Sequence, residues 1–169
     1  FLVHMCGAAG KSLIQATQIA SGGPGVTVWC SSSLALVSQF ADYFDEVTSR
    51  VRYGQEFSNM LSRVQAHVFC SKIDFVNCSE DTKHAFSNST SIEMLTTKVL
   101  DQVFKMANPA NAKEVLAILT TYNSLPNVLR SLADVDVPFR QVIVDEGHHM
   151  AADLSSKVLG SLQIRARTG

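Results

Sequence analysis

Short apolar segments alternate with longer amphipathic segments along this 169-residue chain. The short segments are rich in valine and other apolar residues, a pattern typical of strands buried on both faces. The longer segments carry apolar residues at helical spacing. We therefore predict strands at 1–5, 26–30, 66–70, 115–120 and 141–144. We predict helices at 11–20, 34–43, 51–63, 92–106, 124–132 and 154–162, with a polar loop at 72–91.

The alternation of strands and helices implies crossover connections, and therefore a mostly parallel sheet covered by helices on both faces. The expected fold class is α/β, with three αβα layers. An apolar content of 46% in a chain of this length is sufficient for one domain with a real core. The chain begins directly in a strand and stops without a closing helix, so we expect a fragment truncated at both ends.

Two adjacent acidic residues, Asp145 and Glu146, directly follow the apolar segment 142–144. Unpaired carboxylates are costly to bury, so an acidic pair at a strand end favours a metal ion and a reactive water. We expect Asp145 to hold Mg²⁺ directly or through water. Glu146 would orient and deprotonate the attacking water. The alternative is an acidic turn that caps the next helix.

A small-residue loop with a lysine and a serine follows the first predicted strand. Glycines in this loop allow backbone N–H groups to face phosphate oxygens. Lys11 would neutralise phosphate charge during catalysis, and Ser12 would ligate Mg²⁺. The alternative is a solvated helix start. The expected nucleotide-binding residues are Gly7, Ala8, Ala9, Gly10, Lys11 and Ser12.

Both segments follow strands, and ligands of parallel sheets bind at the carboxyl ends of strands. The Lys11 and Asp145 segments should therefore lie at the same edge of the sheet. Phosphate-binding groups beside metal-binding carboxylates indicate a site for ATP and Mg²⁺.

Net charge, apolar run length and cysteine content restrict the partners and the cellular location expected for a protein with such a site. The net charge of −1 gives no overall basic field, so any contact with nucleic acid must be local. The apolar runs are too short to span a bilayer. Cys6, Cys30, Cys70 and Cys78 form no CxxC pair. We expect buried, reduced thiols, and hence a cytoplasmic protein (or a nuclear or viral-factory protein in a eukaryote or virus).

Four segments together resemble superfamily 2 helicases of the DEAD/DEAH-box type, in the branch with restriction-enzyme-like and phage or viral members. The segment 145–148, Asp-Glu-Gly-His, resembles motif II of that family. The segment 33–39 is similar to motif Ia, and the segment 119–125 is similar to the stretch just upstream of motif II. With the lysine-containing loop, these segments stand in the expected order and cover nearly the whole chain.

The resemblance implies that residues 1–169 belong to a RecA-like, ATP-binding P-loop domain, the first of two motor domains in a helicase. It implies ATP and Mg²⁺ as cofactors, DNA or RNA and a second RecA-like domain as partners, and no membrane. By resemblance, His148 would couple the ATP state to the second motor domain. Hydroxyl and amide groups at strand ends would contact the nucleic-acid backbone. These residues are Ser33, Gln39, Thr120 and Thr121.

Simpler roles stay open for the expected nucleic-acid contacts. Ser33 fits a helix N-cap, and Thr120 and Thr121 fit a β-branched strand end. Two other functions also stay open beside a helicase or translocase. One is a P-loop ATPase that does not act on nucleic acid, and the other is a non-hydrolysing module that binds nucleotide or nucleic acid. Without the arginine finger of a second motor domain, we expect poor ATP turnover from this chain alone.

Overall fold

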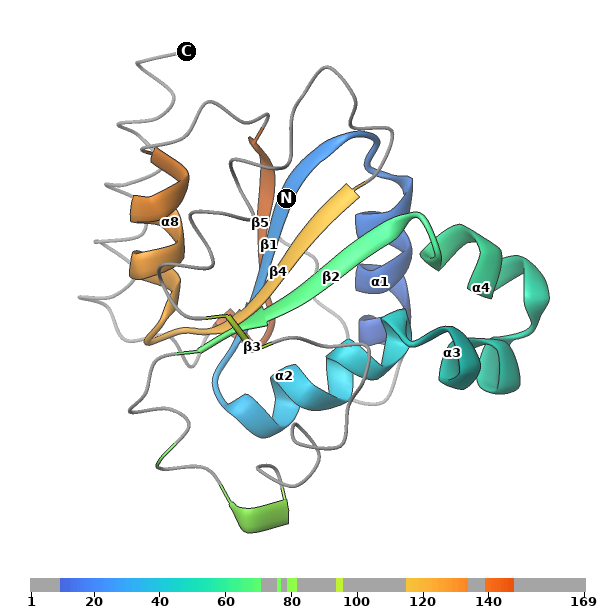
Figure 1. Ribbon diagram of the computed structural model, residues 1–169, viewed down its shortest axis with the longest axis horizontal. Helices are drawn as coiled ribbons and strands as arrows, with labels where there is room; N and C mark the ends of the chain where they lie inside the picture. The colour runs from blue at the N-terminus through green and yellow to red at the C-terminus, as the bar shows by residue number, and fades with distance from the viewer. Residues whose placement is uncertain are drawn as a thin grey trace.

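The computed structural model describes residues 10–70, 76, 79–81, 94–95, 115–133 and 139–147. Its centre is a parallel sheet with the strand order β3-β2-β4-β1-β5 (Figure 1). Every strand pair among the described residues is parallel, so these strands all end at one edge, which we call the carboxyl edge. The strands are β1 (Gly25–Ser31), β2 (Val64–Phe69), β3 (Met94–Leu95), β4 (Val115–Thr121) and β5 (Phe139–Val144).

Helices cover both faces of the sheet, so the predicted αβα layering is confirmed for the described residues (Figure 1). On one face lie α1 (Lys11–Ser21), α2 (Leu34–Ala41) and α4 (Gln55–Leu61). The 3₁₀ helix η1 (Asp42–Phe44) and α3 (Glu46–Tyr53) connect α2 to α4. The opposite face is covered by α8 (Leu125–Ala133).

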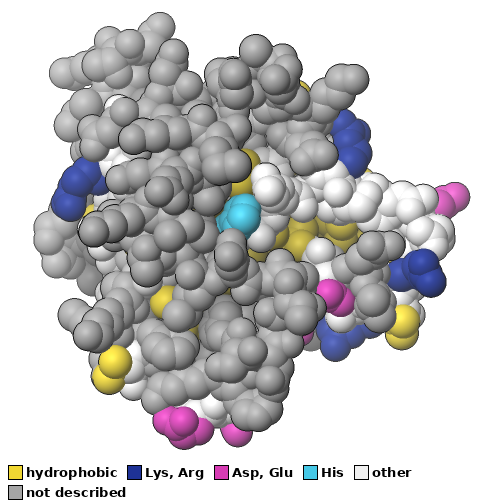
Figure 2. All heavy atoms as spheres, viewed as in Figure 1, with side chains coloured by type: hydrophobic (Ala, Val, Ile, Leu, Met, Phe, Trp, Pro, Cys, Tyr) yellow, Lys and Arg dark blue, Asp and Glu magenta, His cyan; other side chains and the backbone are white. Residues whose placement is uncertain are grey.

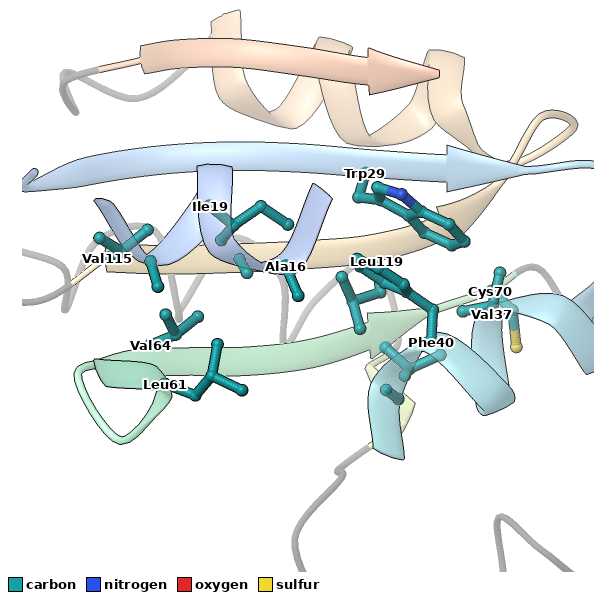
Figure 3. Close-up of a cluster of buried hydrophobic side chains, with 14 of the residues drawn as sticks. Ala16, Ile19, Trp29, Val37, Phe40, Leu61, Val64, Cys70, Val115 and Leu119 are labelled. Carbon is teal, nitrogen blue, oxygen red and sulfur yellow. The ribbon is translucent and has the colours of Figure 1, made fainter. Parts of the chain in front are cut away.

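The two central strands, β1 and β4, are buried along their whole length. Their side chains alternate between the two faces, because successive residues of a strand point to opposite sides. Trp29 of β1 packs on the α1–α2 side, where its ring stacks on Phe40 of α2 with centroids 4.0 Å apart (Figure 3). Val28 and Cys30 pack on the α8 side. Burial on both faces explains why these segments are mostly apolar in the sequence.

Most predicted elements are confirmed within a few residues, but the helix predicted at 51–63 is wrong in extent. Two helices occupy this region, because the chain breaks at Gly54 with φ +89°. This left-handed conformation is one that glycine adopts readily. The first helix, α3, begins earlier than predicted, where the Asp45 carboxylate caps it by accepting a hydrogen bond of 2.8 Å from the Thr48 N–H.

The helix predicted at 92–106 is wrong at Met94 and Leu95. These two residues form β3 and pair in parallel with Val68 and Phe69 of β2. Pairing with the sheet edge thus overrides the helical spacing at these positions. The strand predicted at 1–5, the helix at 154–162 and most of the predicted loop at 72–91 lie outside the described residues.

Candidate functional site

Helix α1 begins at the carboxyl edge with a left-handed residue. Gly10 is its N-cap with φ +74°, and no side chain caps the helix. Lys11 and Ser12 are the first two helical residues, and the first turn holds no acidic residue. The first-turn N–H groups lack intrahelical partners, and the helix dipole places partial positive charge there. This end of α1 is therefore suited to an anion.

Asp145 is fixed at the end of β5 by its backbone. Its N–H donates to the Cys30 carbonyl at 2.9 Å, and its own carbonyl accepts a hydrogen bond from the Tyr122 hydroxyl. Glu146 follows with φ +52°, the one positive φ among the described non-glycine residues. That conformation costs such a residue roughly 1–3 kcal/mol. The strained turn directs Glu146 away from the path of the strand.

The turn brings Glu146 to Lys11, although the two are 135 residues apart in the chain. Lys11 Nζ donates to Glu146 Oε1 in an ion pair. The two side chains are 26% and 33% exposed, so each charge stays within reach of water and of a ligand. The structure thus joins the two segments that the sequence predicted to share an edge.

Gln15 holds the side chain of Asp145 and was not predicted as a site residue. Its Nε2 donates to Asp145 Oδ1 at 3.1 Å, and its Oε1 accepts a hydrogen bond of 2.9 Å from Trp29 Nε1. The sequence did contain one indication, because Gln15 is four residues after Lys11 and so lies on the same face of α1.

A cleft of about 320 Å³ opens beside these groups. Ser12 and Asp145 both line it, so a hydroxyl and a carboxylate from the two predicted segments face one space. The described residues hold no group of three or more His, Cys, Asp or Glu side chains placed for a metal ion. A metal at this point would therefore need oxygens from a bound ligand, which is the usual situation for Mg²⁺ at phosphate-binding sites. The other lining residues are Trp29, Leu36, Gln39, Phe40, Asp42, Tyr43 and Arg52.

Two groups beneath Asp145 stay protonated at neutral pH. Burial raises the pKa of the Cys30 thiol to about 12, and the nearby charge of Asp145 adds to the shift. Burial also raises the pKa of Tyr122, with further contributions from Cys30, Asp145 and Glu146. Tyr122 therefore keeps the hydroxyl proton that it donates to the Asp145 carbonyl. Neither Cys30 nor Tyr122 therefore adds negative charge to the site at neutral pH.

The threonines predicted to contact nucleic acid lie inside the protein. Thr120 is fully buried, and its hydroxyl donates to the Phe69 carbonyl at 2.8 Å. Thr121 is 3% exposed, and its hydroxyl accepts a hydrogen bond of 3.3 Å from the Ser124 N–H. This arrangement favours the strand-end role that the sequence left open.

Ser33 and Gln39 are at the surface, unlike the two threonines. Ser33 caps α2 by accepting a hydrogen bond of 3.3 Å from the Leu36 N–H. Gln39 lies in the last turn of α2, where it lines the cleft. The remaining predicted site residues, Gly7, Ala8, Ala9 and His148, lie outside the described residues.

The predictions on membrane spanning and on cysteine burial can be compared with the structure for the described residues. Within the described ranges, each helix is too short or too polar to cross a membrane. Cys30 and Cys70 are buried, as their apolar neighbours predicted, whereas Cys6 and Cys78 fall outside the described residues. In comparisons with known proteins, no protein-family model, curated protein or solved structure matches this chain.

Proposed function

We propose that this chain is the ATP-binding motor domain of an ATP-dependent nucleic-acid helicase or translocase, with a RecA-like P-loop fold. In the complete protein it would hydrolyse ATP together with a second RecA-like domain. The observation that carries the proposal is the meeting of Lys11 with Glu146, beside a cleft shared by Ser12 and Asp145.

The phosphates of ATP would lie at the start of α1. The N–H groups and dipole of the helix favour negative charge there, and the Lys11 ammonium adds a full positive charge. A triphosphate offers Lys11 several anionic oxygens in place of the single carboxylate of Glu146. Nucleotide binding would therefore release Glu146 from its ion pair. The freed carboxylate would then accept a proton from the attacking water.

Ser12 and Asp145 are the residues that would hold Mg²⁺. The fit rests on their position in one cleft and on Asp145 Oδ2, which has no hydrogen bond to any described residue. When bound, Mg²⁺ would neutralise charge on the phosphate oxygens.

A P-loop ATPase that does not act on nucleic acid is the second candidate. The buried hydroxyls of Thr120 and Thr121 favour it, because hydroxyls that bond to the backbone inside the protein are poorly placed to contact a nucleic-acid backbone. The described Lys and Arg side chains visible in Figure 2 also lie apart rather than in one continuous patch on the face shown. Ser33 and Gln39 are the surface contacts that the helicase proposal retains.

The two candidates differ in their response to nucleic acid. ATP hydrolysis would be measured in the complete protein with and without single- and double-stranded DNA and RNA. The helicase proposal expects a strong stimulation that Lys11→Ala and Glu146→Gln both abolish. Hydrolysis without any stimulation would favour the second candidate.

Arg63→Ala is a matched control for Lys11→Ala. Arg63 is an exposed basic residue immediately before β2, and so lies at the edge opposite the proposed site. Loss of ATP binding in Arg63→Ala as well as in Lys11→Ala would mean that charge removal in general, rather than the phosphate site, is responsible.

A further inference from the structure

A hydrogen-bonded chain runs from the core to the proposed metal ligand. Trp29 Nε1 donates to Gln15 Oε1, and Gln15 Nε2 donates to Asp145 Oδ1. The indole is almost completely buried and is stacked on Phe40 with an interplanar angle of 10° (Figure 3). The first member of the chain is therefore held rigidly by the core.

The chemical nature of Trp29 and Asp145 fixes the direction of the hydrogen bonds that join them through Gln15. An indole N–H can only donate, and an ionised carboxylate can only accept. A side chain that joins them must accept at one end and donate at the other, and an uncharged amide does both. Trp29 thus forces the Gln15 oxygen inward and the Gln15 amino group toward Asp145. The orientation of the Gln15 amide is therefore set by Trp29 and Asp145 together.

Gln15 also determines which oxygen of Asp145 is available. The backbone of Asp145 is held by Cys30 and Tyr122, so the side chain pivots from a fixed point. The amide of Gln15 occupies Oδ1, and no described residue hydrogen-bonds to Oδ2. One oxygen is thereby anchored, and the other is left for a ligand in the cleft that Asp145 shares with Ser12.

We propose that Gln15, oriented by Trp29, is the positioning residue that holds the Asp145 carboxylate with one oxygen presented to the Mg²⁺ of a bound nucleotide. The inference rests on the proposed function, because it assigns a partner to the metal ligand of that same site. Residues that orient metal ligands typically account for 10–100-fold in metal affinity.

The test is the gain in nucleotide affinity that Mg²⁺ provides. Calorimetry would measure binding of a non-hydrolysable ATP analogue with Mg²⁺ and with EDTA, and the ratio of the two affinities is the gain. Gln15→Leu should lower this gain about tenfold and leave the affinity in EDTA unchanged. A role in folding alone would instead weaken both affinities together.

Gln18→Leu is the matched control. Gln18 lies on the same helix and also bonds across to the β5 strand, through its Nε2 to Gln141 Oε1 at 3.0 Å. It does not line the cleft. Its replacement should leave the Mg²⁺ gain unchanged, although it too removes an amide that links α1 to the sheet.

Trp29→Phe provides a second, independent variant. It removes the N–H that orients Gln15 while keeping an aromatic ring in the core. The gain should fall in Trp29→Phe, and the double variant should be no worse than Gln15→Leu alone, because both changes break one chain. Trp29 is the single tryptophan of the protein. Its indole N–H resonance should respond when Mg²⁺ is added to the nucleotide complex of the wild type, and should not respond in Gln15→Leu.

Two failures are distinguishable. If the wild type itself shows no Mg²⁺-dependent nucleotide binding, the proposed function fails and the inference falls with it. If the wild type shows the gain and Gln15→Leu keeps it within twofold, the inference alone is overturned. Additive losses in the double variant would also overturn it, because the two residues would then act separately.

Discussion

Two polar pairs at the carboxyl edge have opposite fates in the structure. Thr120 and Thr121 end β4, and Asp145 and Glu146 directly follow β5. Both pairs stand at the ends of apolar segments, so they look equivalent in the sequence, although β4 is fully buried and β5 only partly buried. The threonine hydroxyls hydrogen-bond to the backbone inside the protein, at Phe69 and Ser124. The acidic side chains instead meet α1, at Lys11 and Gln15.

The charge of a polar group at a strand end decides whether the group can be buried. One backbone carbonyl satisfies the hydroxyl of Thr120, and the residue can then be fully buried. A carboxylate stays costly to bury without a cation or several donors. The acidic pair therefore remains at the partly exposed edge, where a ligand can replace Glu146 as the partner of Lys11 and can reach Asp145 while Gln15 holds it.

Among the substitutions at these two polar pairs, Glu146→Gln should have the largest effect, and the effect should be on ATP hydrolysis. The amide cannot accept the proton of the attacking water, so ATP hydrolysis should fall by about 100–10,000-fold. Nucleotide binding should persist, because Lys11 and the start of α1 remain. Steady-state hydrolysis and a binding titration of the same preparation would measure the two quantities. Hydrolysis at the wild-type rate would remove Glu146 from its proposed role.

The pH dependence of the free energy of unfolding tests whether the buried Cys30 thiol near Asp145 stays protonated in the folded protein. The thiol has a reference pKa of 9.0 and a pKa of about 12 in the folded protein. Above pH 9 the unfolded chain loses this proton while the folded chain keeps it. Stability from this group is therefore complete below pH 9 and falls by about 1.4 kcal/mol per pH unit up to pH 12.

Urea unfolding of the wild type and Cys30→Ala at several pH values would measure this slope. The two proteins should differ in the pH dependence of the free energy of unfolding, with the variant showing the flatter curve above pH 9. Equal slopes in the two proteins would mean that Cys30 is not the titrating group.

Thr120→Val tests whether the buried Thr120 hydroxyl contributes to stability rather than to binding. Removal of the hydroxyl leaves the Phe69 carbonyl without this donor, which should reduce the free energy of unfolding by about 1–2 kcal/mol. Nucleotide and nucleic-acid affinity should not change. A selective loss of nucleic-acid affinity at full stability would support the contact role that the sequence suggested for Thr120.

Thr27→Val is the matched control for Thr120→Val. Thr27 is also a buried threonine of a central strand, but its hydroxyl has no hydrogen-bond partner among the described residues. The same substitution should therefore be neutral or should stabilise the protein by about 1 kcal/mol. Chemical denaturation of both variants would show whether the two substitutions change the free energy of unfolding in opposite directions.

Ser33→Ala should have the smallest effect. The exposed cap bond of 3.3 Å to Leu36 is long, so its loss should reduce stability by only about 0.5 kcal/mol. Thermal unfolding would measure this loss, and nucleic-acid binding by the complete protein would be measured beside it. A fall in nucleic-acid affinity larger than the loss of stability would support Ser33 as a backbone contact.

The sequence predicted most of the fold because the central strands are mostly apolar. β1 and β4 are buried on both faces, so burial and composition agree at most positions, with buried hydroxyls as the exceptions. The errors occurred where tertiary structure overrides local pattern. Gly54 breaks one predicted helix into two, and Met94 and Leu95 leave a helical pattern to pair with β2.

Part of the candidate site followed from topology alone. Parallel strands end together, so Lys11 and the acidic pair could be assigned to one edge before any contact was known. The role of Gln15 could not be predicted, since it depends on Trp29 and Asp145, which only the fold brings to that side chain. The burial of Thr120 depended in the same way on the neighbouring carbonyl of Phe69.

A calorimetric titration of Mg²⁺·ATP into the wild type, Lys11→Ala and Arg63→Ala is the most direct test of a nucleotide site at the carboxyl edge. If Lys11, Ser12 and Asp145 form a phosphate and Mg²⁺ site, the wild type and Arg63→Ala should bind alike, and Lys11→Ala should lose most of the affinity. Equal binding by all three proteins, or binding by none, would contradict a nucleotide site at this edge of the sheet.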